Sequence, residues 1–156
     1  MIVGNHQTAE RKCALGAFEL TLYQMSVFTS LLLAIAFLQL AVISLGRGWI
    51  GSLPLKSRIW LIRAHRFGGY IGFFIILLVS YTCVVYLTVR FGPARVAVHS
   101  IVGTILIVAV LSKIVIVHGV KRLYTYLPLF GIIVFVSVVI VWVTAALWYF
   151  YYQGFG

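Results

Sequence analysis

The sequence predicts an all-α protein, a single integral membrane domain over residues 1–156 that is built as a four-helix bundle. Hydrophobic residues make up 63% of the 156 residues and charged residues only 9%, whereas roughly a quarter of a soluble domain is charged. The apolar residues are gathered into four long blocks, each near the length of about 20 residues that crosses a hydrocarbon core. Because backbone N–H and C=O groups in lipid need internal partners, we expect every block to be a helix.

The four spans are expected, in order along the chain, at residues 20–45, 67–89, 96–117 and 127–149. The first span follows a polar tail without a cleavage site, so we expect it to act as an uncleaved insertion signal. The connection over residues 46–64 interleaves basic residues with two tryptophans, which is typical of an interfacial segment. A tight turn at Gly92-Pro93 predicts that the second and third helices form an adjacent antiparallel hairpin. Pro128 suits the first turn of the fourth helix.

The charged residues are almost all basic: twelve Lys and Arg stand against Glu10 and Glu19, for a net charge of +10. Because they lie mainly beside the span ends, we interpret them as topology signals and contacts to anionic lipids, and we expect no nucleic-acid partner. Seven of them lie on the side of residues 46–64 and four on the side of the tail. This bias predicts a prokaryotic plasma-membrane protein with both termini outside. A cation pump is not expected, because such pumps hold acidic residues inside the membrane.

Three histidines near the ends of the expected helices are the main candidates for chemistry. The turn at residues 92–93 has His65 about 27 residues before it and His118 about 26 residues after it. At about 1.5 Å per helical residue, these two rings reach nearly the same depth. His99 lies 19 residues from His118, which is roughly 28 Å along the helix. His65 and His118 are therefore expected to share one metal-containing cofactor, and His99 is expected to stay outside that site.

Two histidines on antiparallel membrane helices are a common way to hold a b-type haem through axial bonds. The sequence adds Gly69 four residues after His65 and Gly103 four residues after His99, and each glycine leaves space for a flat macrocycle or another helix. The basic residues expected near the haem propionates are Arg63, Arg66 and Lys113. Lys113 lies inside a span, where a lysine with a purely structural role would snorkel to the interface.

Simpler interpretations remain open for the same residues. Histidines at helix ends often contact only water and lipid headgroups. The Gly68-x-x-x-Gly72 pattern is common where membrane helices pack closely. A second haem on His99 would need a partner at similar depth, and the sequence offers only Cys83, Met25 and His6.

A family resemblance supports the haem interpretation over roughly residues 60–150. It is carried by His65-Arg66-Phe67-Gly68-Gly69, by Arg95, His99-Ser100-x-x-Gly103 and Lys113, and by Trp142 with Trp148-Tyr149-Phe150. These motifs resemble those of small haem-b membrane cytochromes and ferric-reductase-like transmembrane domains. The resemblance implies a helical bundle that moves single electrons through histidine-ligated haem. The usual set of four ligands for two haems is incomplete in this chain.

The sequence thus supports two hypotheses. The first is a b-type cytochrome that carries single electrons within a respiratory or redox membrane complex, with other membrane subunits and a quinol as possible partners. The second is a cofactor-free accessory subunit of a larger membrane complex. Either is expected to be a subunit rather than a stand-alone enzyme. A small-solute transporter is not expected, because no span is interrupted near its middle.

Overall fold

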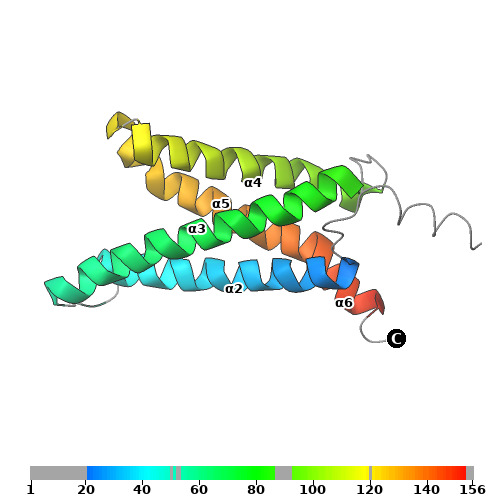
Figure 1. The fold of residues 1–156 in the computed structure, drawn as a ribbon, viewed down its shortest axis with the longest axis horizontal. Helices are drawn as coiled ribbons and strands as arrows, with labels where there is room; N and C mark the ends of the chain where they lie inside the picture. Colours follow the sequence, from blue (N-terminus) through cyan, green and yellow to red (C-terminus); the bar gives the residue numbers. More distant parts are fainter. Residues whose placement is uncertain (1–20, 50, 52–53, 87–92, 120, 154–156) are drawn as a thin grey trace, which may run out of the picture.

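The computed structural model describes the chain apart from residues 1–20, 50, 52–53, 87–92, 120 and 154–156. Within the described residues, four long helices run along one common direction (Figure 1), and each is long and apolar enough to cross a membrane. They are α2 (Leu22–Gly46), α3 (Leu55–Tyr86), α4 (Ala94–Gly119) and a composite last helix that begins with η1 (Lys121–Tyr126) and α5 (Leu127–Trp142). The predicted all-α membrane bundle is confirmed. The tail, residues 87–89 of the second predicted span and Gly92 lie outside the described residues.

The first long helix, α2, begins with a capping box. The hydroxyl of Thr21 accepts from the N–H of Gln24 at 3.2 Å, and the side chain of Gln24 accepts from the N–H of Thr21 at 2.9 Å. Two N–H groups that lack helical partners are satisfied in this way. Farther along, the hydroxyls of Ser26, Thr29 and Ser30 donate to carbonyls four residues earlier. The hydrogens of these three hydroxyls are therefore satisfied within the helix, as lipid requires.

The second helix, α3, starts at Leu55, about three turns before the predicted residue 67. Pro54 precedes it and accepts from the N–H of Arg58 at 3.2 Å, which closes the first turn. The prediction of a connection over residues 46–64 is therefore wrong in its extent, since only residues 47–54 join α2 to α3. Hydropathy marks where lipid begins, but a helix keeps its backbone hydrogen bonds in the polar headgroup region. The basic first turns of α3 consequently lie outside the apolar pattern.

The bundle is made of two antiparallel pairs, α2 with α3 and α4 with α5. The pairs meet mainly through α2 and α5, where the indole N–H of Trp142 donates to the hydroxyl of Ser30 at 2.9 Å. At the end that carries the α2–α3 and α4–α5 connections, the start of α3 and the end of α4 lie apart (Figure 1, left). The core cluster is formed by Leu32, Ile75, Ile76, Leu106, Val110, Val138 and Val141.

This pairing corrects the expectation that the second and third helices pack against each other. α3 and α4 are antiparallel but touch only briefly. The reason lies in the glycines of α3. A Cβ at Gly68 would collide with the side-chain amide of Gln39, and one at Gly72 would lie 3.8 Å from Leu32 and 3.9 Å from Ile35. Both glycines of the Gly68-x-x-x-Gly72 pattern therefore lie on the face of α3 that packs against α2, where small residues are common in membrane helices.

The last helix continues past α5 through a π-helical turn, η2 (Val143–Leu147), into α6 (Trp148–Gln153). The predicted span of residues 127–149 is thus observed and extended by one turn. The first turn of α2 lies at the same end of the bundle as the whole of α6 (Figure 1, right). Four crossings therefore bring the described chain back to the side on which it started. We call this end the terminal end, and the opposite end, which carries residues 47–54 and 119–126, the loop end.

Candidate functional site

His65 is half-buried on the face of α3 that meets α2, near the loop end. Its Nδ1 lies 3.2 Å from the backbone carbonyl oxygen of Gln39. With its amide nitrogen toward α3, the Gln39 side chain donates to the His65 carbonyl at 2.9 Å and to Nδ1 at 2.5 Å, and it accepts from the N–H of Gly69 at 3.3 Å. Every contact of the ring uses Nδ1, so Nε2 is the nitrogen available to a ligand. Gln39 was not among the predicted site residues.

The glycines near His65 divide into two roles. Gly68 is the close contact with Gln39, whereas a Cβ added at Gly69 would meet no atom of the described residues within 4 Å. Gly69 is exposed, so open space lies beside the helix one turn from His65. Open space also lies beside Gly103, one turn from His99.

His118 occupies the loop end of α4, but its ring is turned away from a shared site. It is exposed, and its Nδ1 lies 3.0 Å from the carbonyl oxygen of Ile114 in its own helix. A carbonyl oxygen only accepts, so this contact places the ring hydrogen on Nδ1 and leaves a lone pair on Nε2. The structure brings His65 and His118 to the same end of the bundle but does not bring their rings together. Equal depth fixes a height along the bundle axis and leaves the angle around each helix undetermined.

Lys113 continues the core-facing stripe of α4. Leu106 and Val110 are buried on this stripe, and Lys113 follows Val110 by three residues and is half-buried. Arg47 directly follows α2, His65 lies in the first third of α3, and Lys113 lies six residues before the end of α4. One basic or titratable group from each of α2, α3 and α4 therefore gathers at the loop end.

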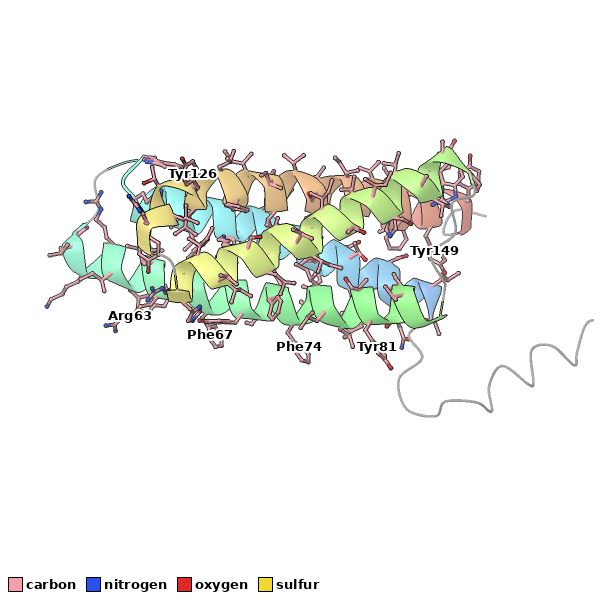
Figure 2. All side chains as sticks on the ribbon, turned by 90° about the horizontal axis from the view of Figure 1, so that it is seen from above. Arg63, Phe67, Phe74, Tyr81, Tyr126 and Tyr149 are labelled. Atoms are coloured by element: carbon pink, nitrogen blue, oxygen red, sulfur yellow. The ribbon has the colours of Figure 1, made fainter. Side chains whose placement is uncertain are left out.

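The other predicted cations point outward. Arg63 and Arg66 are exposed on α3, and Figure 2 shows Arg63 on the outer edge of that helix. Of the basic residues predicted near a cofactor, only Lys113 faces the interior of the bundle. Within the described residues, no group of three or more His, Cys, Asp or Glu side chains is placed to hold a metal ion.

His99 is held across helices at the terminal end, in an arrangement that the sequence did not predict. Its Nδ1 lies 3.0 Å from the hydroxyl oxygen of Thr144, and that hydroxyl donates to the carbonyl of Ile140 at 2.8 Å. The Thr144 hydrogen is thus in use, so Nδ1 of His99 is the donor and its Nε2 carries the lone pair.

Arg95 completes this cluster one turn before His99. Its guanidinium donates to the backbone carbonyl of Thr144 at 2.5 Å and lies 4.6 Å from the centre of the Trp148 ring. The Thr144 carbonyl belongs to the π-helical turn Val143–Leu147. Such turns often occur at functional sites. The spacing of Arg95 and His99 could have predicted that both side chains lie on one face of α4. Their contacts with Thr144 and Trp148 could not be predicted from spacing.

Comparison with known families matches residues 1–156 to the family described as "Family of unknown function (DUF6529)". Neither the curated proteins nor the solved structures contain a match to this chain.

Proposed function

The chain belongs to the DUF6529 family, and for it we propose the function of a membrane-embedded b-type cytochrome subunit that carries single electrons. In this proposal one haem b would be held at the loop end by Nε2 of His65. The observation that carries it is the local environment of His65. Gln39 holds the ring through Nδ1, and the space beside Gly69 is open. A haem-ligating histidine needs its other nitrogen held in this way, because that contact fixes the orientation of the ring.

His118 would be the second residue that holds the haem in this proposal. It reaches the loop end on α4, and its Nε2 already carries a lone pair because Nδ1 donates to the Ile114 carbonyl. To meet the haem, the His118 ring must turn from the exposed face of α4 toward α3. The start of α3 and the end of α4 lie apart at this end, so the two helices are not held in contact there.

A haem bound at this place supplies one-electron redox chemistry. The residues of the chain hold and surround it. For Nε2 of His65 to bind iron, the ring hydrogen would have to be on Nδ1, where the backbone carbonyl of Gln39 accepts it. The side-chain NH2 group of Gln39, which donates to Nδ1 in the orientation described above, would then have to turn away from the ring. Lys113 supplies positive charge for the propionates from inside the bundle. The apolar residues of the bundle lower the local dielectric constant and exclude water.

The proposal includes the setting of this subunit. The loop end faces the cytoplasm of a prokaryotic cell, as the excess of basic residues at that end favours. The electron donor is a quinol or a partner protein, and the acceptor is another redox centre of the same membrane complex.

The test is the visible spectrum of the purified protein and of three single variants. Wild-type protein should show a reduced-minus-oxidised spectrum typical of six-coordinate haem b. His65→Ala and His118→Ala should each remove or convert that spectrum, because an axial position is lost. His99→Ala is the matched control and should leave it largely intact. If His99→Ala removes the haem and His118→Ala does not, the assignment of ligands is wrong; wild type without haem would refute the proposal.

A cofactor-free accessory subunit is the second candidate, and the exposed apolar surface favours it. Only 17–22% of the most apolar stretch of each span is buried within the bundle. Phe67, Phe74 and Tyr81 recur every seven residues along the outer edge of α3 and are 55–69% exposed (Figure 2). Aromatic residues at this spacing form one stripe, which suits contact with another membrane helix. Recovery of the protein without haem, in a stable complex with other membrane chains, would favour this candidate.

A further inference from the structure

A groove lies on the outer surface of the bundle, between α4 and the start of the last helix. Its volume is about 580 Å³, within the range of small-molecule sites. On α4 it is lined by apolar residues and one serine between Val108 and Ile116, and on the other side by Leu123, Tyr126 and Phe130. Figure 2 shows Tyr126 at the loop end. Most of the lining side chains are exposed, so the groove opens toward the surrounding lipid.

The turn between α4 and the last helix gives this groove its shape. The hydroxyl of Tyr124 donates to the carbonyl of Val117 at 3.0 Å, which holds η1 against the end of α4. Residues three apart share one face of a 3₁₀-helix, so Leu123 and Tyr126 both face the groove from η1. Ile116 is buried and forms the floor. Contacts within one helix pair therefore define the groove.

The groove has the depth of one lipid leaflet. Val108 lies near the middle of α4, and Gly119, the last residue of that helix, follows it by eleven residues. At about 1.5 Å per residue, this distance is roughly 16 Å. Half of a hydrocarbon core about 30 Å thick has nearly the same length. The groove thus runs from the loop end to the middle of the span, as an acyl chain of the leaflet at that end does.

A cation lies next to the groove where it meets the loop end. Arg122 directly precedes Leu123 in η1, and its side chain is exposed. A guanidinium group presents a planar fork of N–H donors that matches the oxygens of a phosphate. Apolar walls with a cation at one end complement an amphiphile that has an apolar chain and an anionic headgroup. A neutral isoprenoid would match the walls alone.

We propose that an anionic phospholipid binds in this groove, with one acyl chain between α4 and the last helix and its phosphate at Arg122. The apolar walls retain the chain, and the guanidinium selects the charge of the headgroup. The site does not depend on the proposed haem, because this ligand needs neither His65 nor a metal.

The experiment measures lipid retention by native mass spectrometry on purified protein taken from nanodiscs of equal phosphatidylglycerol and phosphatidylcholine. Wild-type protein should retain one phospholipid and prefer phosphatidylglycerol about fivefold, since one cation near a membrane surface contributes about that factor. Arg122→Gln should still retain a lipid but lose the preference. Val115→Trp fills the groove from α4 and should abolish retention of both lipids. Leu123→Trp fills it from the opposite wall and should give the same result, so the outcome does not depend on how one variant folds.

The matched controls are Ile101→Trp, at an exposed position of α4 outside the groove, and Arg63→Gln, at an exposed cation near the start of α3. Both should behave as wild type. An equal loss in these controls would mean a general surface effect and would overturn the site. Wild type without a retained phospholipid, wild type with a neutral isoprenoid in its place, or unchanged retention in both groove-filling variants would also overturn it. The haem spectrum is not part of this measurement, so its absence bears only on the proposed function.

Discussion

At the scale of single residues, each histidine in the described helices is defined by what holds its Nδ1. Gln39 holds His65 from the neighbouring helix, Thr144 holds His99 in the same way, and His118 contacts only its own helix. A cross-helix contact fixes a ring against two backbones, whereas a contact within one helix leaves the ring free to turn with its side-chain rotamers. The contacts of each ring therefore distinguish candidate ligand histidines that could not be distinguished from the sequence.

The role of Thr144 leads to a prediction about stability. Thr144→Val removes the hydroxyl that accepts from His99 and leaves a half-buried ring nitrogen without that partner. We expect a loss of about 1–3 kcal/mol in the free energy of unfolding in mixed micelles, the usual effect of an unsatisfied buried polar group.

Thr104→Val is the control for this measurement, because the Thr104 hydroxyl also donates to a carbonyl four residues earlier but contacts only its own helix. It should change the unfolding free energy by much less. Equal losses in the two variants would mean that the contact with His99 contributes nothing beyond the bond within the helix.

At the scale of helices, the small residues of α3 determine its neighbour. Gly68 and Gly72 lie on the face of α3 that meets α2, and a Cβ at Gly68 would displace the end of the Gln39 side chain. This face packs along α2 rather than along α4. A short turn between two spans joins their ends. It does not determine which faces of the helices meet.

This packing predicts opposite outcomes for two adjacent glycines. Gly68→Ala should displace the flexible end of the Gln39 side chain and so remove its contacts with His65 and Gly69, with a loss of about 1 kcal/mol in the free energy of unfolding. Gly69→Ala has open space and should be neutral or stabilising by up to about 1 kcal/mol, since alanine favours the helix. Thermal unfolding of the apoprotein in detergent measures both effects. A stabilising Gly68→Ala would show that α3 does not approach α2 as closely as described.

At the scale of the whole molecule, two helix pairs meet in a thin core, and most of the side-chain surface of each helix faces outward. Lipid or partner chains must therefore cover much more of this protein than its own helices do. The polar clusters lie at the two ends of the bundle, His65 with Gln39 and Lys113 at one end and Arg95 with His99 and Thr144 at the other. This arrangement keeps hydrogen-bonding groups away from the middle of the hydrocarbon layer.

The topology gives a prediction that covers the entire chain. Single cysteines at Gly51 and at Tyr152, in a background with both native cysteines replaced, should react with a membrane-impermeant reagent from opposite sides. Equal reactivity from one side would contradict four crossings. A reporter fused after Phe155 that is active only in the cytoplasm would contradict the proposed orientation, which rests on seven basic residues against four.

The sequence by itself determined the class of this protein and the number of its helices. Long apolar blocks can satisfy their backbone groups in lipid only as helices, so the spans followed from composition and length. It also identified the histidines and the open glycines beside two of them, because polar groups and missing side chains stand out in an apolar chain. The extent of α3 was not predicted, since its first turns are basic and helical hydrogen bonds do not depend on hydropathy.

Only the tertiary structure decided which helix faces meet. Depth along a helix follows from counting residues, but the rotation of each helix about its axis depends on packing with all its neighbours at once. For this reason the equal depth of His65 and His118 was predictable, whereas the separation of their rings was not. The partners Gln39 and Thr144 belong to helices distant in sequence from their histidines. Side-chain packing between helices brings these groups together, and no local sequence pattern predicts such contacts.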